Sequence, residues 1–218
     1  SVQIRFGRDL EPLSRAQTKP LMDGWLPVVL LTAEDGPVRY EFTFWATPLP
    51  SVKDCEKAFD GPAEGENFLN WIQVRVTNTG SAACDGKLVI EQAGPYEKEK
   101  HPAPSVSSPR EFAWPIEPGK SVECSLAIPW EPVEGGDFSK EDPKVWLERT
   151  VAYWRGVMAG AASIQVPCEK ATQAYLAAHV CQHIASDHGE LHGGEGFYDE
   201  FYIRDGAYQV MELEEAGL

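Results

Sequence analysis

Val38-Arg-Tyr-Glu-Phe-Thr-Phe-Trp45 alternates strictly between apolar and polar side chains, which places three aromatic rings on one face of an extended chain. The run Phe68-Leu-Asn-Trp-Ile-Gln-Val-Arg-Val-Thr77 has the same period and ends at Asn78-Thr-Gly80. This alternation, bounded by glycine, proline and asparagine, is typical of antiparallel strands that bury one face. A sheet of this kind needs a partner layer, so the two runs predict a β-sandwich.

Further short runs with strand character extend the same pattern toward both ends of this region, at residues 2–6, 25–31, 87–91 and 122–128. Two intervening segments, 50–67 and 94–110, are rich in charged residues, proline and glycine. We interpret them as solvated connections on the rim of the sandwich. Residues 1–140 are therefore predicted to form the β-sandwich domain.

The periodicity becomes helical near residue 141. Asp142 can cap a helix that has Pro143 in its first turn. The apolar stripe of this helix is predicted to consist of Leu147, Val151, Trp154 and Met158. Residues 141–167 then form a linker helix followed by an extended link.

Two more helices follow in the segment 168–218. The first is expected from about residue 169 to 186, with its apolar face formed by Ala174, Ala177, Val180, Cys181 and Ile184. The second is predicted to open at Asp205 and to end at Gly217, a favourable residue just after a helix. The two helices form an αα-hairpin that cannot cover both of its apolar stripes by itself. Either the hairpin packs on the sandwich or further helices complete its core. Without such cover, we expect a dimer or another association through the uncovered hairpin, or a poorly ordered carboxy terminus.

The composition excludes several classes of partner. Nineteen basic and thirty-four acidic side chains give a formal net charge of −15, which repels nucleic acids and anionic membranes. No apolar run approaches the roughly 20 residues that span a bilayer. The five cysteines are odd in number and form no Cys-x-x-Cys pair. This pattern favours buried free thiols in a reducing compartment, and hence a cytoplasmic location.

Aromatic and charged side chains crowd into Tyr198-Asp-Glu-Phe-Tyr-Ile-Arg-Asp205. Carbohydrate sites pair aromatic faces, which stack on sugar rings, with carboxylates and guanidinium groups that bind hydroxyls. Tyr198, Phe201 and Tyr202 can supply the rings, and Arg204 and Asp205 the charged groups. The alternative is a helix cap, an exposed arginine and core aromatics.

Two other clusters carry weaker hypotheses. Glu195, Asp199 and Glu200 could bring two carboxyl groups within the roughly 5–9.5 Å that glycoside hydrolysis requires, but a polar loop is the favoured interpretation. Histidines at positions i and i+4 of a helix can share a zinc ion. The histidines concerned are His179 and His183, followed by His188 and His192. Exposed helix histidines are the favoured interpretation, so no metal and no cofactor is predicted.

Tyr202-Ile-Arg-Asp205, followed by an amphipathic helix that ends in Leu213-Glu-Glu-Ala-Gly217, resembles the start of the barrel in glucoamylase-like and glycogen-debranching six-hairpin glycosidases. Many members carry an amino-terminal β-supersandwich, a linker helix and then an (α/α)6 barrel. The order of segments agrees with this arrangement over the whole chain. The sandwich resemblance rests on Asp23-Gly-Trp-Leu-Pro27, Phe44-Trp-Ala-Thr-Pro48 and residues 73–80, and the linker resemblance on Tyr153-Trp-Arg155 and Ile164-Gln-Val-Pro167.

The resemblance implies the amino-terminal part of a glycoside hydrolase that acts on α-linked glucosides or related sugars by inversion. Arg204 and Asp205 would bind sugar hydroxyls at the non-reducing end, with Tyr202 and Tyr198 completing the substrate-binding set. The group often has tryptophan where this chain has Tyr202. Its general acid and base lie on later hairpins, so no catalytic residue is expected here. The alternative is a non-catalytic carbohydrate-binding or interaction module.

Overall fold

The computed structural model describes residues 2–13, 19–49, 68–92, 110–130, 138–187, 190–193 and 201–218. Over these residues the chain is mainly β, with two large antiparallel sheets followed by three helices. This architecture is consistent with the predicted β-sandwich. The rim segment 50–67 and most of 94–110 lie outside the described residues.

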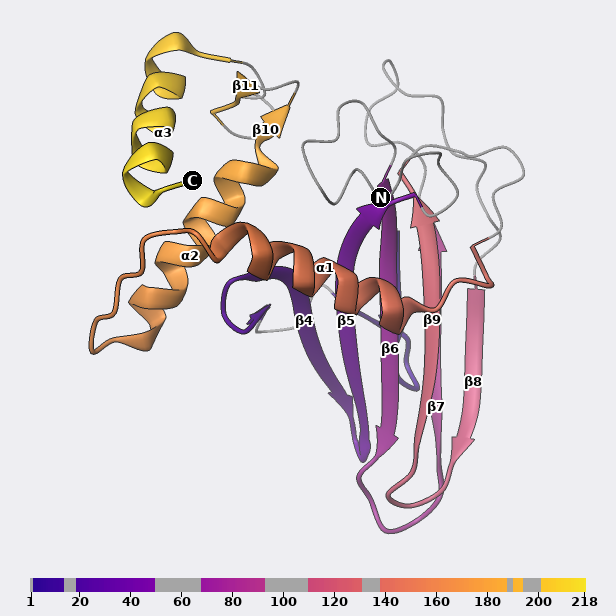
Figure 1. Cartoon of the computed structure of the whole chain (residues 1–218). Helices are drawn as coiled ribbons and strands as arrows, with labels where there is room; N and C mark the ends of the chain where they lie inside the picture. The colour runs from indigo at the N-terminus through magenta and orange to yellow at the C-terminus, as the bar shows by residue number, and fades with distance from the viewer. Residues whose placement is uncertain are drawn as a thin grey trace. The chain divides into compact units, whose positions relative to one another are not determined.

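The first sheet has the strand order β2-β1-β7-β8 and the second the order β3-β4-β5-β6-β9 (Figure 1). The strands of the first sheet are β1 (Val2–Phe6), β2 (Glu11–Pro12), β7 (Cys84–Gln92) and β8 (Arg110–Ile116). Those of the second are β3 (Leu21–Met22), β4 (Leu26–Asp35), β5 (Val38–Pro48), β6 (Phe68–Asn78) and β9 (Ser121–Pro129). The two strands whose alternation was described first, β5 and β6, are neighbours in the second sheet.

The chain divides into two compact units. Unit 1 contains residues 1–20, 29–44 and 70–139, and unit 2 contains residues 21–28, 45–69 and 140–218. Unit 1 therefore holds the whole first sheet and most of the second. Unit 2 holds the helices together with end segments of β4, β5 and β6.

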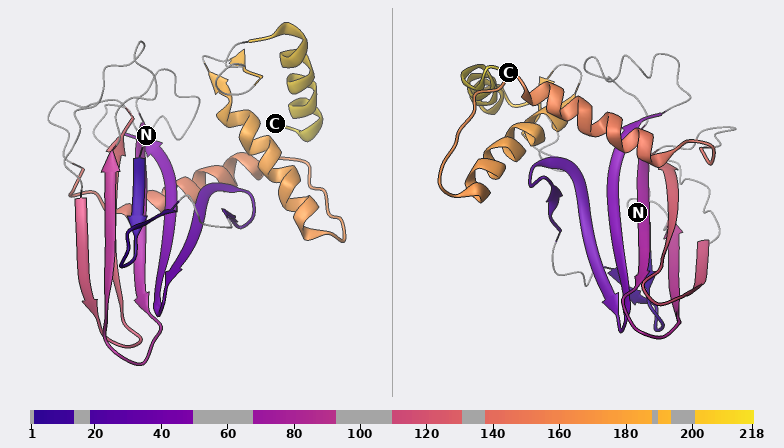
Figure 2. Two further views of the ribbon diagram at one scale, coloured as in Figure 1. Left: turned by 180° about the vertical axis from the view of Figure 1, so that it is seen from behind. Right: turned by 60° about the horizontal axis from the view of Figure 1, so that its bottom comes forward.

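Unit 1 is held together by buried apolar side chains from both sheets. Figure 2 shows the strands of these sheets from two further sides. The rings of Phe6 and Tyr40, from different sheets, lie 5.3 Å apart. The Tyr40 hydroxyl accepts a hydrogen bond from the backbone N–H of Lys87 at 3.1 Å, which satisfies the polar end of a buried ring. The core members are Ile4, Phe6, Leu13, Leu31, Ala33, Val38, Tyr40, Phe42, Ile72, Val74, Val76, Leu88, Ile90, Ile116 and Leu126.

Asn78 joins two turns of the sandwich. Its side chain is fully buried, and its amide nitrogen donates to the carbonyl oxygens of Ala82 and Ile116, each at 2.8 Å. Its amide oxygen accepts a bond from the Gly80 backbone N–H at 2.9 Å. All polar atoms of this buried amide are used, so Asn78 fixes the turn after β6 against the end of β8.

The helices of unit 2 are α1 (Pro143–Met158), α2 (Glu169–Ile184) and α3 (Ile203–Ala216), with a short hairpin of β10 (Ser186–Asp187) and β11 (Glu190–Leu191) after α2. Asp142 caps α1 as predicted, since its carboxylate accepts a bond from the Lys144 backbone N–H at 2.9 Å. Gly217 ends α3 in the left-handed conformation, with φ 78°, also as predicted. However, α3 begins at Ile203 rather than at Asp205. None of the described helices is long and apolar enough to cross a membrane.

The apolar face predicted for α2 is only partly correct. Val180 is buried as predicted and Ala177 is half-buried, but Ala174, Cys181 and Ile184 are exposed, and His179 is buried instead. Alanine and cysteine gain little from burial, because each removes little apolar surface from water. The larger rings of Tyr175 and His179 pack together instead, with centroids 4.4 Å apart.

The burial predicted for the stripe of α1 is only partly correct. Met158 is buried, but Trp146 and Thr150 accompany it in place of the half-buried Leu147 and Val151. The indole N–H of Trp146 donates to the Glu141 carboxylate at 2.9 Å, which allows this ring to be buried.

The cysteines are free at every described position. Cys84 and Cys124 are half-buried, and burial raises the pKa of the Cys124 thiol to about 11. Cys168 and Cys181 are exposed, so the prediction of buried thiols is wrong for these two residues. Cys55 lies outside the described part of the chain.

Candidate functional site

The start of α3 carries the predicted sugar-binding residues. Tyr202 is the extended residue just before the helix, and Asp205 lies in its first turn. The Tyr202 carbonyl accepts the first helical hydrogen bond, from the Gly206 N–H at 2.7 Å. The backbone N–H groups at this end of the helix carry a partial positive charge, which attracts a nearby carboxylate such as that of Asp205.

Arg204 and Asp205 form a loose and accessible pair. The guanidinium Nη2 of Arg204 lies 3.4 Å from Oδ1 of Asp205, and their side chains are 84% and 48% exposed. An exposed ion pair of this kind contributes little to stability. Both groups can therefore turn toward a ligand without leaving a buried charge behind.

The aromatic residues beside this pair have different environments. Phe201 lies against the helix, since a Cβ added at Gly206 would come within 2.5 Å of its ring. Phe201 also bridges to His192 through its backbone. Tyr202 is half-buried. The structure thus brings Tyr202, Arg204 and Asp205 together within one turn.

Several residues of the predicted sites lie outside the part of the chain that the structure describes. Tyr198 lies outside the described residues, and so do the carboxylates of the second hypothesis: Glu195, Asp199 and Glu200.

The histidines do not form a metal centre in the described part of the chain, where no group of three or more suitable side chains comes together. His188 lies outside that part. His179 is buried, contrary to the prediction of an exposed histidine, and its Nδ1 lies 2.9 Å from the Tyr175 carbonyl oxygen. A carbonyl oxygen only accepts, so Nδ1 carries the proton and donates.

His183, one turn further along α2, is half-buried. Its Nε2 and the Nε2 of His179 are buried without a hydrogen-bond partner among the described residues. Burial, and to a lesser degree the neighbouring His179, lowers the pKa of His183 below its usual value. Both effects disfavour the charged imidazolium.

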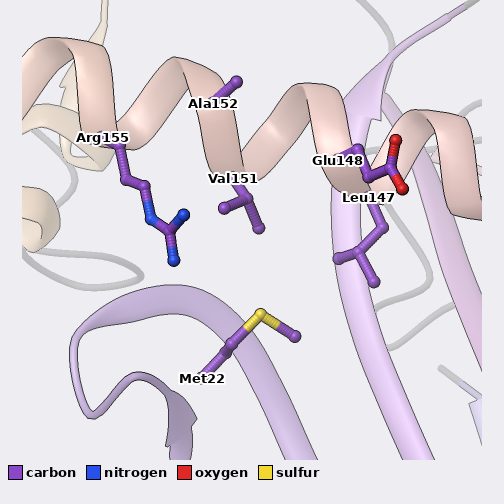
Figure 3. Close-up of a pocket in the computed structure, with 6 residues that line it drawn as sticks. All are labelled: Met22, Leu147, Glu148, Val151, Ala152 and Arg155. Carbon is purple, nitrogen blue, oxygen red and sulfur yellow. The ribbon is translucent and has the colours of Figure 1, made fainter.

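An open apolar groove of about 350 Å³ lies between α1 and Met22 of β3 within unit 2 (Figure 3). Leu147, Val151 and Arg155 point from α1 toward Met22. Arg155 is already held by Asp23, whose carboxylate lies 2.7 Å from its guanidinium. Sequence reasoning missed this groove because it assigned Leu147 and Val151 to a covered stripe. The groove offers apolar contact but no convergent polar groups, so the start of α3 is the stronger candidate for binding a polar ligand.

Searches of protein-family models, of curated proteins and of solved structures found no match to this chain.

Proposed function

We propose that this chain is the amino-terminal part of a glycoside hydrolase that acts on α-linked glucosides or related sugars. In this proposal α2 and α3 form the first hairpin of an (α/α)6 barrel, and the β-sandwich is the scaffold that precedes it. The order of sandwich, linker helix and helix pair supports the proposal, as does the sequence resemblance around Tyr202-Ile-Arg-Asp205.

The observation that carries the proposal is the accessibility of Arg204 and Asp205. A guanidinium donates through several N–H groups and a carboxylate accepts through two oxygens, so together they suit the vicinal hydroxyls of a pyranose. Their mutual distance of 3.4 Å leaves both partly free to bind. Tyr202 would add a ring at the edge of the same subsite.

The chain contributes binding rather than catalysis in this proposal. Inverting hydrolysis needs a general acid and a general base about 6.5–9.5 Å apart, on either side of the scissile bond. The six-hairpin resemblance places both on later hairpins. The role of this chain is therefore to hold one flank of the terminal sugar.

Titration with maltose, followed by backbone amide NMR, tests the proposal. We expect chemical-shift changes at the start of α3, and a loss of affinity of about fivefold or more in Arg204→Ala and Asp205→Asn, because each removes one hydroxyl partner. Arg39→Ala is the matched control, since Arg39 forms a similarly exposed pair with Glu34 at 3.2 Å on the sandwich. If the two α3 variants bind maltose as well as the control does, the proposal is wrong.

A non-catalytic carbohydrate-binding module is the second candidate. It is favoured by Trp130, which lies just after β9 and is 67% exposed. Exposed indole rings are effective platforms for sugar faces. The same titration separates the two candidates. If the chain is a module of this kind, maltose should change the chemical shift of the Trp130 indole N–H and leave those of the α3 amides unchanged.

A further inference from the structure

Helix α3 is anchored on one face. Gly206, Leu213 and Ala216 are buried, and they recur at the spacing of a single helix face. The Ala216 carbonyl also accepts a bond from the Ala162 N–H at 2.6 Å. These contacts fix the rotation of α3 about its own axis, and they thereby determine which of its side chains face outward.

Tyr208 is an aromatic side chain on the same side of α3 as the proposed sugar-binding pair. It follows Arg204 by four residues and Asp205 by three, and side chains at these spacings are neighbours on the surface of a helix. At about 100° per residue, Tyr208 projects about 40° from Arg204 and about 60° from Asp205 around the helix axis. Its direction therefore falls between those of the two charged groups, one turn further along the helix.

The Tyr208 ring is accessible to a ligand that touches this pair. Tyr208 is 66% exposed, and the side chains of Arg204 and Asp205 are 84% and 48% exposed. The Cα–Cβ bonds of a helix tilt toward its amino-terminal end, which brings the ring toward the turn that carries the pair. The three side chains therefore form one open surface on which an aromatic ring adjoins a cation and an anion.

We propose that Tyr208 holds a second sugar unit beside the one that Arg204 and Asp205 hold. This inference rests on the proposed function, in which the charged pair binds hydroxyls of the terminal sugar. The next unit of the same ligand then lies over the Tyr208 ring, with its apolar C–H face against the aromatic face. Tyr208 is thus a binding residue that favours a disaccharide over a monosaccharide.

The rest of α3 limits this surface to two sugar units. Tyr208 is the only aromatic residue between Ile203 and Ala216. Glu212 continues its line by one turn, but the Glu212 carboxylate already accepts a bond from the Gln182 side chain at 2.7 Å. Glu215 is the next acidic residue on this side, and it lies roughly 16 Å along the axis from Arg204 at 1.5 Å per residue. A third unit therefore meets neither an aromatic ring nor an uncommitted carboxylate within one turn of Tyr208.

Titration of the intact chain with glucose, maltose and maltotriose, followed by amide NMR of α3, tests this inference. We expect maltose to bind about fivefold more tightly than glucose, because its second unit adds one stacking contact. Maltotriose should bind within about twofold of maltose, because the third unit adds no comparable contact.

The ratio of the maltose and glucose affinities identifies the role of Tyr208. Tyr208→Ala should reduce this ratio to about one, whereas Tyr208→Phe keeps the ring and should keep the ratio. Arg204→Ala should weaken the binding of both sugars. Val210→Ala is the matched control that should keep the ratio, because Val210 is 45% exposed on the same helix and projects about 160° from Tyr208.

The possible outcomes distinguish this inference from the proposed function. A wild-type chain that binds glucose and maltose equally, or a Tyr208→Ala variant that keeps the wild-type ratio, would overturn the role of Tyr208 while sugar binding by Arg204 and Asp205 stands. A wild-type chain that binds neither sugar would overturn both. Circular dichroism confirms that each variant is folded, and a ratio of two affinities is unaffected by a partial loss of folded protein.

Discussion

Gly86 occupies a point at which the two sheets of unit 1 approach too closely for a side chain. A Cβ at this position would lie 2.9 Å from Cγ1 of Val76 on the facing sheet and 3.1 Å from Cδ1 of Ile116. The glycine is therefore required by packing rather than by backbone conformation. Overpacking at such a point forces neighbouring side chains out of their preferred rotamers.

We expect Gly86→Ala to lower the free energy of unfolding by about 1–3 kcal/mol, because Val76 and Ile116 must move to admit the methyl group. Urea denaturation measures the change. The control is Gly156→Ala in α1, where no atom lies within 4 Å of an added Cβ. That variant should be more stable by roughly 0.5–1 kcal/mol, since alanine favours a helix. Equal free energies of unfolding for the two variants would show that the facing sheet moves to admit the methyl group at no cost, which would contradict the prediction.

Asn78 shows which features of a single residue can be predicted from the sequence and which cannot. Asn78-Thr-Gly80 was predicted to end a strand, and β6 does end at Asn78. The hydrogen bond from Asn78 to the Ile116 carbonyl could not be predicted. It depends on the return of β8 to the same end of the sandwich, which no local pattern encodes.

At the scale of elements, strands were predicted better than helix faces. The alternation in β5 places Tyr40, Phe42 and Phe44 on one face; Tyr40 and Phe42 are indeed buried, and Phe44 is half-buried against the same core. In α2 the same reasoning was only partly correct, because small residues dominated the supposed stripe. A helix rich in alanine has no strongly preferred inner face, so contacts with other elements decide which side is buried.

The buried side of α2 makes unit 2 sensitive to acid. The pKa of His183 is lowered in the folded chain, mainly by burial. The unfolded chain therefore binds a proton at higher pH than the folded chain does. The contribution of His183 to stability is fully present above its unfolded pKa of about 6.5 and is lost as pH falls through the lower folded pKa.

Thermal unfolding between about pH 8 and about pH 5 measures this effect. We expect the unfolding temperature to decrease on the acid side of this range. His183→Gln should make this decrease smaller, because the glutamine side chain does not bind a proton. The comparison is between the slopes of the two curves, so a general loss of stability in the variant does not affect it. Parallel curves for wild type and variant would exclude His183 as the source.

At the scale of the whole molecule, the proximity of the candidate site residues could be predicted, whereas their exposure could not. Their proximity was predictable because they are close in the sequence. Tyr202, Arg204 and Asp205 fall within one turn of the chain, so the start of any helix there brings them together. Their exposure was not predictable, since it depends on which face of α3 is anchored by Gly206, Leu213 and Ala216. The same anchoring leaves Val210 and Met211 exposed, at 45% and 54%.

The net charge of −15 should cause the chain as a whole to repel polyanions such as DNA. We expect no binding of a labelled DNA duplex in fluorescence anisotropy, even at about 50 mM salt, where screening is weak and like charges repel most strongly. The test is strict because low salt also strengthens any local basic patch that could oppose the net charge. Lowering the pH below the sequence pI of about 4.7 reverses the sign of the charge and supplies the positive control. Micromolar binding at neutral pH would show that a basic surface outweighs the charge of the whole chain.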